Sequence, residues 1–437
     1  MSKKGTILTV GDSIQGPTGF ANDLAGVSWC LAKDYDVHIL GLQTIQKQIV
    51  EIDVEGERRK VTQHPNYPKL NNRFDFGTRS LPILLDQLNP DILLTVNDIQ
   101  MINHVPVTMC PPGININIVD LPSKTFKSEY ALFEELKGQV TKFREKFPRD
   151  TKWIAYCPQD GDPPMPNWSG IYRMADQTVA MAKYGQWVFK EFFKMDVPYI
   201  WHGVNTKLFN KKNKPKELQN KFVIGNFNRN QPRKQPVRCM EAFAKFAKDK
   251  PDVLLHMQMD WNDEFGWPIN YFAQQYGIQG KMISPRPIGM PRDEVAKTYS
   301  MWDINVTPTA GEGFGLTHIE GFACGLPSIA TDYTTSKELI IDGKPGPRGT
   351  LVPAKDLYWQ TLNVAAVRRS LIDINALADT YNKYYYNRDL VKEHGNNAME
   401  WAKKNVSWGI IQKYWIELVG NVIAGNVCTS KDGQSPK

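Results

Sequence analysis

The stretch PTAGEGFGLTHIEGFACGLPSIATD, residues 308–332, decides the fold and locates the expected site. A β-strand is expected to end at Pro308, and a glycine-rich turn at 311–315 leads into a helix that begins near Leu316. Glycines in such a turn let the backbone approach a ligand closely. The N-terminus of the following helix presents free N–H groups and a partial positive charge. The stretch therefore predicts an anion-binding turn between a strand and a helix.

Two carboxylates lie eight positions apart in this stretch, Glu312 before the expected helix and Glu320 inside it. A carboxylate can accept hydrogen bonds from the vicinal hydroxyls of a ribose or a hexose. The spacing alone is a weak signal, but the intervening glycines and the turn at 325–327 strengthen it. The pattern favours a site for a sugar nucleotide, and the alternative is a glycine-rich turn with surface glutamates.

Outward from this stretch, short apolar runs alternate with segments of helical periodicity, which is typical of parallel, doubly wound α/β sheets. A Lys-, Asn- and Pro-rich stretch interrupts the alternation and reads as a linker. We expect an N-terminal domain at 1–205, the linker at 206–221 and a C-terminal domain at 222–395, with ligand bound beyond the carboxyl ends of the strands. The expected strands of the first half are 6–10, 37–40, 92–96, 114–119 and 153–157, with helices at 20–32 and 81–88. The segment 389–422 reads as one long amphipathic helix.

Composition sets further limits. The net charge of +7 over 437 residues fits an anionic partner such as a nucleotide, nucleic acid or an acidic membrane surface, without choosing among them. We find no run of about 18 apolar residues that could span a bilayer, and the N-terminus reads as a first strand and not as a secretory signal. The six cysteines are scattered without a C-x-x-C pair. Buried free thiols in a cytoplasmic protein (host cytoplasm if the protein is viral) are expected.

The signature EGFGLTHIEGFACGLPSIATD resembles that of the GT-B-fold retaining glycosyltransferases, specifically glycosyltransferase family 4. Residues 224–246 resemble the strand–Arg–Lys–helix element of that family, 200–209 its domain-junction segment and 394–408 its C-terminal helix. The first half of the chain matches more loosely. The resemblance implies the GT-B architecture, two Rossmann-like domains facing across a cleft, with a helix at 396–425 that crosses back to the first domain.

The resemblance also implies roles for residues of the second domain. Arg229 and Lys234 match the basic pair that holds the donor diphosphate, which suits the negative charge of a departing nucleoside diphosphate; Arg233 is expected to be a bystander. Glu320 would accept from the ribose hydroxyls, and Glu312 would contact the transferred sugar. The donor-binding turn would consist of Gly313, Phe314, Gly315, Leu316 and Thr317.

In the first domain, the resemblance assigns Gly16 and Gly19 to a turn that approaches the donor phosphate and the acceptor. The family usually carries a histidine at the strand end near residue 160. Here Asp160 stands there, so either Asp160 takes that catalytic position or the role is absent. The DGD at 160–162 resembles a metal-binding D-x-D motif of the GT-A fold, but it lies far upstream of the donor-binding half. We therefore expect no metal ligand, no obligatory metal and no cofactor other than the nucleotide-sugar co-substrate.

The implied activity is transfer of a sugar from a nucleotide-diphosphate-sugar to an acceptor hydroxyl of a glycan, a lipid-linked molecule or a small molecule. Alternatives are another activity on the same fold, such as a phosphorylase or epimerase, and an inactive nucleotide-sugar-binding module. Trp168 and Tyr172, four residues apart, could stack on a sugar or a base. An acceptor hydroxymethylated base in DNA is then another alternative, unless both aromatics merely pack the core. The segment 130–147 mixes acidic and basic residues, so strong membrane docking is not expected.

Overall fold

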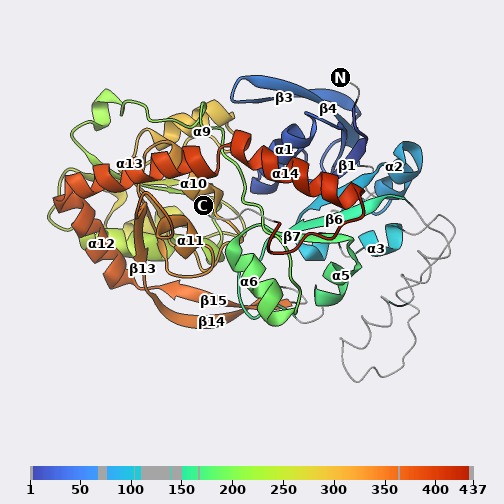
Figure 1. Ribbon diagram of the computed structural model, residues 1–437. Helices are drawn as coiled ribbons and strands as arrows, with labels where there is room; N and C mark the ends of the chain where they lie inside the picture. The colour runs from blue at the N-terminus through green and yellow to red at the C-terminus, as the bar shows by residue number, and fades with distance from the viewer. Residues whose placement is uncertain are drawn as a thin grey trace.

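The computed structural model describes residues 3–66, 76–102, 104–109, 138, 150–165, 168–362 and 365–432. The strand expected at 114–119 and the amphipathic segment at 130–147 lie outside these residues. Figure 1 shows two α/β domains, each built around its own sheet, with the C-terminal helices running across both. In the described part of the chain, no helix is long and apolar enough to cross a membrane.

The first domain contains a sheet with the strand order β3-β4-β2-β1-β5-β6-β7. All neighbouring strands are parallel except β3, which pairs antiparallel with β4. The interior strand β5 is buried along its whole length, as expected for a parallel sheet covered on both faces. The strands are β1 (Thr6–Gly11), β2 (Asp36–Gly41), β3 (Gln48–Val54), β4 (Glu57–Pro65), β5 (Ile92–Val96), β6 (Lys152–Cys157) and β7 (Gln177–Ala180). The helices include α1 (Gly19–Leu31), α2 (Ser80–Leu88), α3 (Val105–Thr108), α5 (Trp168–Met174) and α6 (Lys183–Phe192).

The second domain contains a fully parallel sheet with the order β10-β9-β8-β11-β12-β13. Its strands are β8 (Phe222–Phe227), β9 (Val253–Gln258), β10 (Met282–Ile283), β11 (Ile304–Thr307), β12 (Ser328–Thr331) and β13 (Gly349–Val352). Its helices are α7 (Pro236–Phe246), α8 (Ile269–Gln275), α9 (Arg292–Tyr299), α10 (Leu316–Ala323), α11 (Ser336–Ile340) and α12 (Ile374–Tyr386). Two doubly wound sheets, one fully parallel and one parallel except for β3, confirm the predicted fold class. The carboxyl ends of β8 and β11, which pair side by side, bring the loops after them together.

The sequence analysis missed two antiparallel hairpins. The first joins β3 to β4 through Glu55 and Gly56, which both have positive φ (56° and 84°), as a two-residue type I′ turn requires. The second consists of β14 (Ala354–Leu362) and β15 (Ala365–Ile372), which pair with each other outside both large sheets. It appears in orange below β13 in Figure 1. This hairpin lies between the last strand of the second sheet and α12.

The segment expected to be one long helix is two helices, so that prediction is wrong. α13 (Arg388–Asn405) packs against α10 of the second domain, whereas α14 (Trp408–Ile423) packs against α1 of the first. The break falls at Val406 because its carbonyl accepts a hydrogen bond of 2.7 Å from the amide of Val204, in the segment that joins the domains. The chain can therefore change direction there and return to the first domain (Figure 1).

Candidate active site

The glycine-rich turn after β11 lies against the end of β6 in the first domain. A Cβ on Gly311 would lie 2.2 Å from the carbonyl oxygen of Asp160, and one on Gly313 would lie 2.3 Å from the Cβ of Pro158. Gly311 and Gly315 also have positive φ (154° and 107°), which disfavours other residues there. The turn therefore needs glycine both for its own conformation and for the close approach of the two domains.

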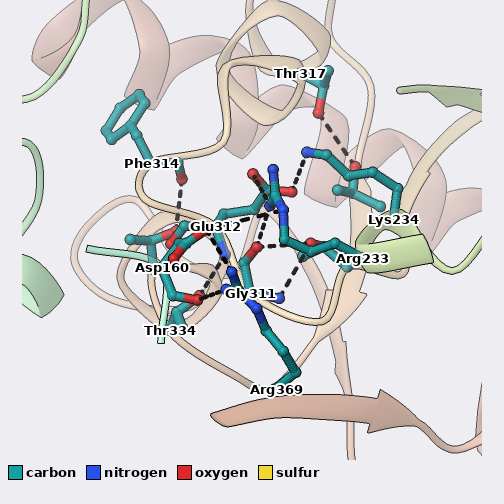
Figure 2. A network of polar contacts seen from close by, with 12 residues as sticks. Asp160, Arg233, Lys234, Gly311, Glu312, Phe314, Thr317, Thr334 and Arg369 are labelled. Atoms are coloured by element: carbon teal, nitrogen blue, oxygen red, sulfur yellow. Dashed lines mark hydrogen bonds and ion pairs between the residues drawn. The ribbon is translucent and has the colours of Figure 1, made fainter. Parts of the chain in front are cut away.

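Glu312, in this turn, binds two cations from the loop after β8. Its side chain is buried and contacts the Lys234 ammonium through Oε1, and its Oε2 lies 3.2 Å from Nη1 of Arg233 (Figure 2). Burial lowers the pKa of Lys234 to about 8, although the Glu312 carboxylate acts in the opposite direction. Burial alone would raise the pKa of Glu312, but Lys234 and Arg233 hold it well below its usual range. Both partners therefore remain charged at neutral pH.

Arg229, expected from the sequence to bind the donor diphosphate with Lys234, does not join this cluster; its contact with a diphosphate stays a prediction. Its side chain is 64% exposed and its Nε lies 3.4 Å from Oδ2 of Asp263. The physical reason is a 3-10 turn, η4 (Pro232–Lys234), which precedes α7 and aims Arg233 and Lys234 at Glu312. The amide of Ala310 donates to the carbonyl of Arg233 at 2.7 Å, which fixes this loop beside the glycine-rich turn. The bystander of the sequence analysis, Arg233, is thus the arginine that contacts Glu312.

Asp160 lies at the interface of the two domains, at the end of β6. Its Oδ2 is 3.1 Å from Nη2 of Arg369, on β15, and 3.9 Å from Nε of Arg233. The sequence analysis named neither Arg369 nor Asp98, which follows β5. Burial raises the pKa of Asp98 to about 6, and the charge of Asp160 acts in the same direction, while Arg233 and Arg369 oppose it. An acidic residue two positions after a buried parallel strand was the available signal for Asp98.

The remaining carboxylate of the motif, Glu320, faces α9 and not Glu312. Its side chain is buried; Oε2 accepts a hydrogen bond of 2.8 Å from the Tyr299 hydroxyl, and Oε1 lies 2.5 Å from Nη2 of Arg292. One oxygen is therefore held by a buried phenol, while the other pairs with a partly exposed guanidinium. The expected ribose contact remains a prediction.

In the first domain, Gly19 begins α1 and faces the second domain. A Cβ on Gly19 would lie 3.4 Å from Cδ1 of Leu316, at the start of α10, so the two helix N-termini meet. Gly16 lies in the preceding turn and donates its amide to the carbonyl of Ser13 at 2.7 Å. The loop between β1 and α1 thus forms the first-domain wall next to the donor-side turn.

Of the two aromatic residues predicted to contact the acceptor, Tyr172 cannot provide a stacking platform, so that prediction is wrong. Its side chain is 1% exposed and packs edge-on against Phe189, with ring centroids 4.7 Å apart, and its hydroxyl accepts a hydrogen bond of 2.6 Å from Gln159. Trp168 is partly buried and packs on the same core. Trp168 and Tyr172 therefore do not form a pair of stacking surfaces for a base acceptor.

The DGD at 160–162 is occupied by protein contacts. Asp162 accepts hydrogen bonds from the hydroxyls of Tyr184 (2.9 Å) and Tyr333 (3.0 Å) and pairs with Arg368 at 2.8 Å. Asp160 pairs with Arg369, as described above. Within the described ranges, no group of three or more His, Cys, Asp or Glu side chains could hold a metal ion.

Comparisons with known proteins agree with this architecture. Residues 208–393 match the family model described as Glycosyl transferases group 1. The D-inositol 3-phosphate glycosyltransferase of Paenarthrobacter aurescens (strain TC1) is 28% identical over 115 residues, which are 26% of this chain and 28% of that relative. The matched stretch therefore spans little more than a quarter of the relative's length.

Two solved structures superpose over nearly the whole chain. The sucrose-phosphate synthase of Thermosynechococcus elongatus has a TM-score of 0.69 at 15% identity, covering 97% of this chain and 100% of the other. Anabaena HepE, solved in complex with UDP-glucose, has a TM-score of 0.64 at 14% identity, covering 95% and 100%. This chain is a two-domain α/β protein with the GT-B fold. Residues 208–393, somewhat less than half of the chain, are similar to the group 1 glycosyltransferase domain.

Proposed function

We propose that the protein is a retaining glycosyltransferase that moves a sugar from a nucleotide-diphosphate-sugar to an acceptor hydroxyl. The observation that carries the proposal is the pairing of Glu312 with Arg233 and Lys234 beside the N-terminus of α10. Two cations and free helix N–H groups suit a diphosphate, and a carboxylate suits the hydroxyls of a sugar. The matched relative is named a glycosyltransferase, and HepE was solved with UDP-glucose.

In the proposed reaction, Arg233, Lys234 and the α10 N-terminus stabilise the charge that develops on the departing nucleoside diphosphate. The acceptor hydroxyl attacks from the face on which the diphosphate leaves, and its proton passes to the departing phosphate oxygen. The new bond to the anomeric carbon replaces the bond to phosphate, with retained configuration. No protein base is needed, and the side-chain cations take the place of a metal ion.

Glu312 has two roles in this proposal. Before the donor binds, Glu312 neutralises Lys234 and, together with Asp160, the charge of Arg233. When the donor binds, its diphosphate competes for the cations, and the released carboxylate oxygens can accept from the sugar hydroxyls. Glu312 therefore pairs with the two cations in the free protein and binds the sugar hydroxyls once the donor is present.

The first experiment is a panel of UDP, GDP, ADP and their sugar conjugates tested for thermal stabilisation. A ligand at about 100 times its dissociation constant stabilises the folded state by roughly 2.7 kcal/mol. We expect one nucleotide to stabilise the protein and its sugar conjugate to be consumed with release of that nucleoside diphosphate. Binding without turnover, with water or with any hydroxyl acceptor, would favour an inactive binding module, and failure of the whole panel to bind would contradict the proposal.

A further inference from the structure

The β14–β15 hairpin forms part of the boundary between the domains. A Cβ on Gly161 of the first domain would lie 2.2 Å from Cγ1 of Val367 and 2.7 Å from the carbonyl oxygen of Arg368. The amide of Ala366 lies 3.3 Å from the sulfur of Met165. The loop that follows β6 therefore rests directly on β15, although the hairpin belongs to neither sheet.

Arg369 is the residue that this hairpin delivers to the site. Its side chain is 1% exposed, and its Nη2 lies 3.1 Å from Oδ2 of Asp160. Nη1 donates to the backbone carbonyl of the same aspartate (Figure 2). Nε donates to Oε1 of Gln360 at 3.2 Å. Arg369 pairs with Tyr358 in the hairpin register, so Gln360, two residues further along β14, shares its face. The hydrogen bond to Gln360 of the same hairpin thus fixes the orientation of the Arg369 guanidinium.

This arrangement joins Asp160 to the donor-side turn. One guanidinium binds both the carboxylate and the carbonyl of Asp160, which fixes side chain and backbone together. The same Nη1 would lie 3.1 Å from a Cβ on Gly311, so Arg369 also contacts the glycine-rich turn closely. A lysine could not supply these contacts, because an ammonium lacks the planar fork.

We propose that Arg369 is a positioning residue that fixes Asp160 of the first domain against the Gly311–Glu312 turn of the second. Asp160 then faces the sugar side of the donor site in one orientation when transfer occurs. This inference rests on the proposed function. The nucleoside diphosphate is held by the second domain through Arg233 and Lys234, so its binding does not depend on Arg369.

The test compares R369Q with the wild type in turnover and in nucleoside diphosphate affinity. The probes are UDP or GDP, whichever stabilises the wild type, and the matching sugar nucleotide. We expect kcat to fall by about 10²-fold, the order expected for a misplaced catalytic group, while the dissociation constant for the nucleoside diphosphate changes by less than about threefold. R369K, which keeps the charge without the fork, should also lose turnover and replaces R369Q if the latter fails to fold.

R368Q is the matched control, because Arg368 lies on the same strand and pairs with Asp162 across the same boundary at 2.8 Å. Its loss of turnover should be much smaller. Equal losses in R368Q and R369Q would mean that the hairpin only holds the domains together, which would overturn the positioning role. In a cycle with D160N, the double variant should lose no more turnover than the more damaged of the two single variants; additive losses would also overturn the positioning role.

Crystal structures of the wild type and R369Q test the inference without any substrate. We expect the Asp160 carboxylate to leave its position near Nε of Arg233 (3.9 Å in the wild type) in R369Q. An unmoved Asp160 would overturn the inference whether or not a donor is known. Failure of the wild type to bind or consume any sugar nucleotide would instead refute the proposed function, and the two failures are therefore distinguishable.

Discussion

Replacing Glu312 by glutamine should tighten the binding of a nucleoside diphosphate while abolishing sugar transfer. In the free protein, this one carboxylate pairs with two partly buried cations, with Oε2 at 3.2 Å from Nη1 of Arg233 and Oε1 in contact with Lys234. A bound diphosphate must share or take over these cations. Because E312Q keeps the size of the side chain and removes its charge, both cations become fully available to the phosphates.

The magnitude follows from the geometry. A phosphate on the far side of Arg233 would lie about 6 Å from Glu312, roughly twice the observed contact, and two unit charges at that distance repel by roughly 3 kcal/mol at an effective dielectric constant of about 20. Residual hydration and the remaining polarity of glutamine reduce this to about half. The expected gain is about 1.4 kcal/mol, or roughly tenfold in the dissociation constant.

Isothermal titration calorimetry with UDP or GDP measures this effect directly, and turnover of the sugar conjugate is measured on the same preparations. E320Q is the matched control, because Glu320 lies on the following helix and binds Tyr299 and Arg292 instead. E320Q should weaken the binding of the nucleoside diphosphate, because the expected contact with the ribose is lost. Unchanged or weaker nucleotide binding by E312Q would refute the reasoning that Glu312 competes with the donor for its cations.

Three further predictions concern the same site. Arg233→Ala and Lys234→Ala should each lower kcat by about 10²–10³-fold, whereas Arg229→Ala, an exposed side chain paired with Asp263, should be mild; a sensitive Arg229 and an insensitive Arg233 would restore the assignment made from the sequence. The pKa of Lys234 is lowered to about 8 by burial, so the ammonium is present below that pH and kcat/KM for the donor should fall as pH rises through it. Lys234→Arg should move this basic limb upward, and a pH profile identical to that of the wild type would contradict the role of Lys234. Activity should survive excess EDTA, and complete loss restored by Mn²⁺ would make the aspartates of 160–162 metal ligands.

Much of the fold could be predicted from the sequence because parallel strands and their helices have strong local signals. The bounds expected for β5 match the structure, and α10 begins at Leu316 as expected. The hairpin β14–β15 was missed because its strands carry charged residues such as Arg368 and Arg369, whose partners lie in the other domain. Sequence periodicity indicates which face of an element is buried, but it does not indicate ion pairs with residues far away in the chain.

The candidate site was predicted in part for the same reason. The glycine-rich turn and Glu312 are identified by local pattern, but the choice between Arg229 and Arg233 depends on how the η4 turn aims each side chain. The burial of Tyr172 depends on Phe189 and Gln159, which are distant in sequence. The predicted and observed sites therefore differ at residues whose positions depend on tertiary packing, which the local sequence does not report.

The most direct test of the central claim is an NMR analysis of the anomeric configuration before and after reaction of the preferred sugar nucleotide. The donor is incubated with the wild type and with a hydroxyl acceptor from a screened panel. We predict release of the nucleoside diphosphate and a product whose anomeric configuration is the same as in the donor, with both absent in Lys234→Ala. Inverted configuration would contradict the retaining mechanism, and turnover by Lys234→Ala at the wild-type rate would contradict the assignment of the site.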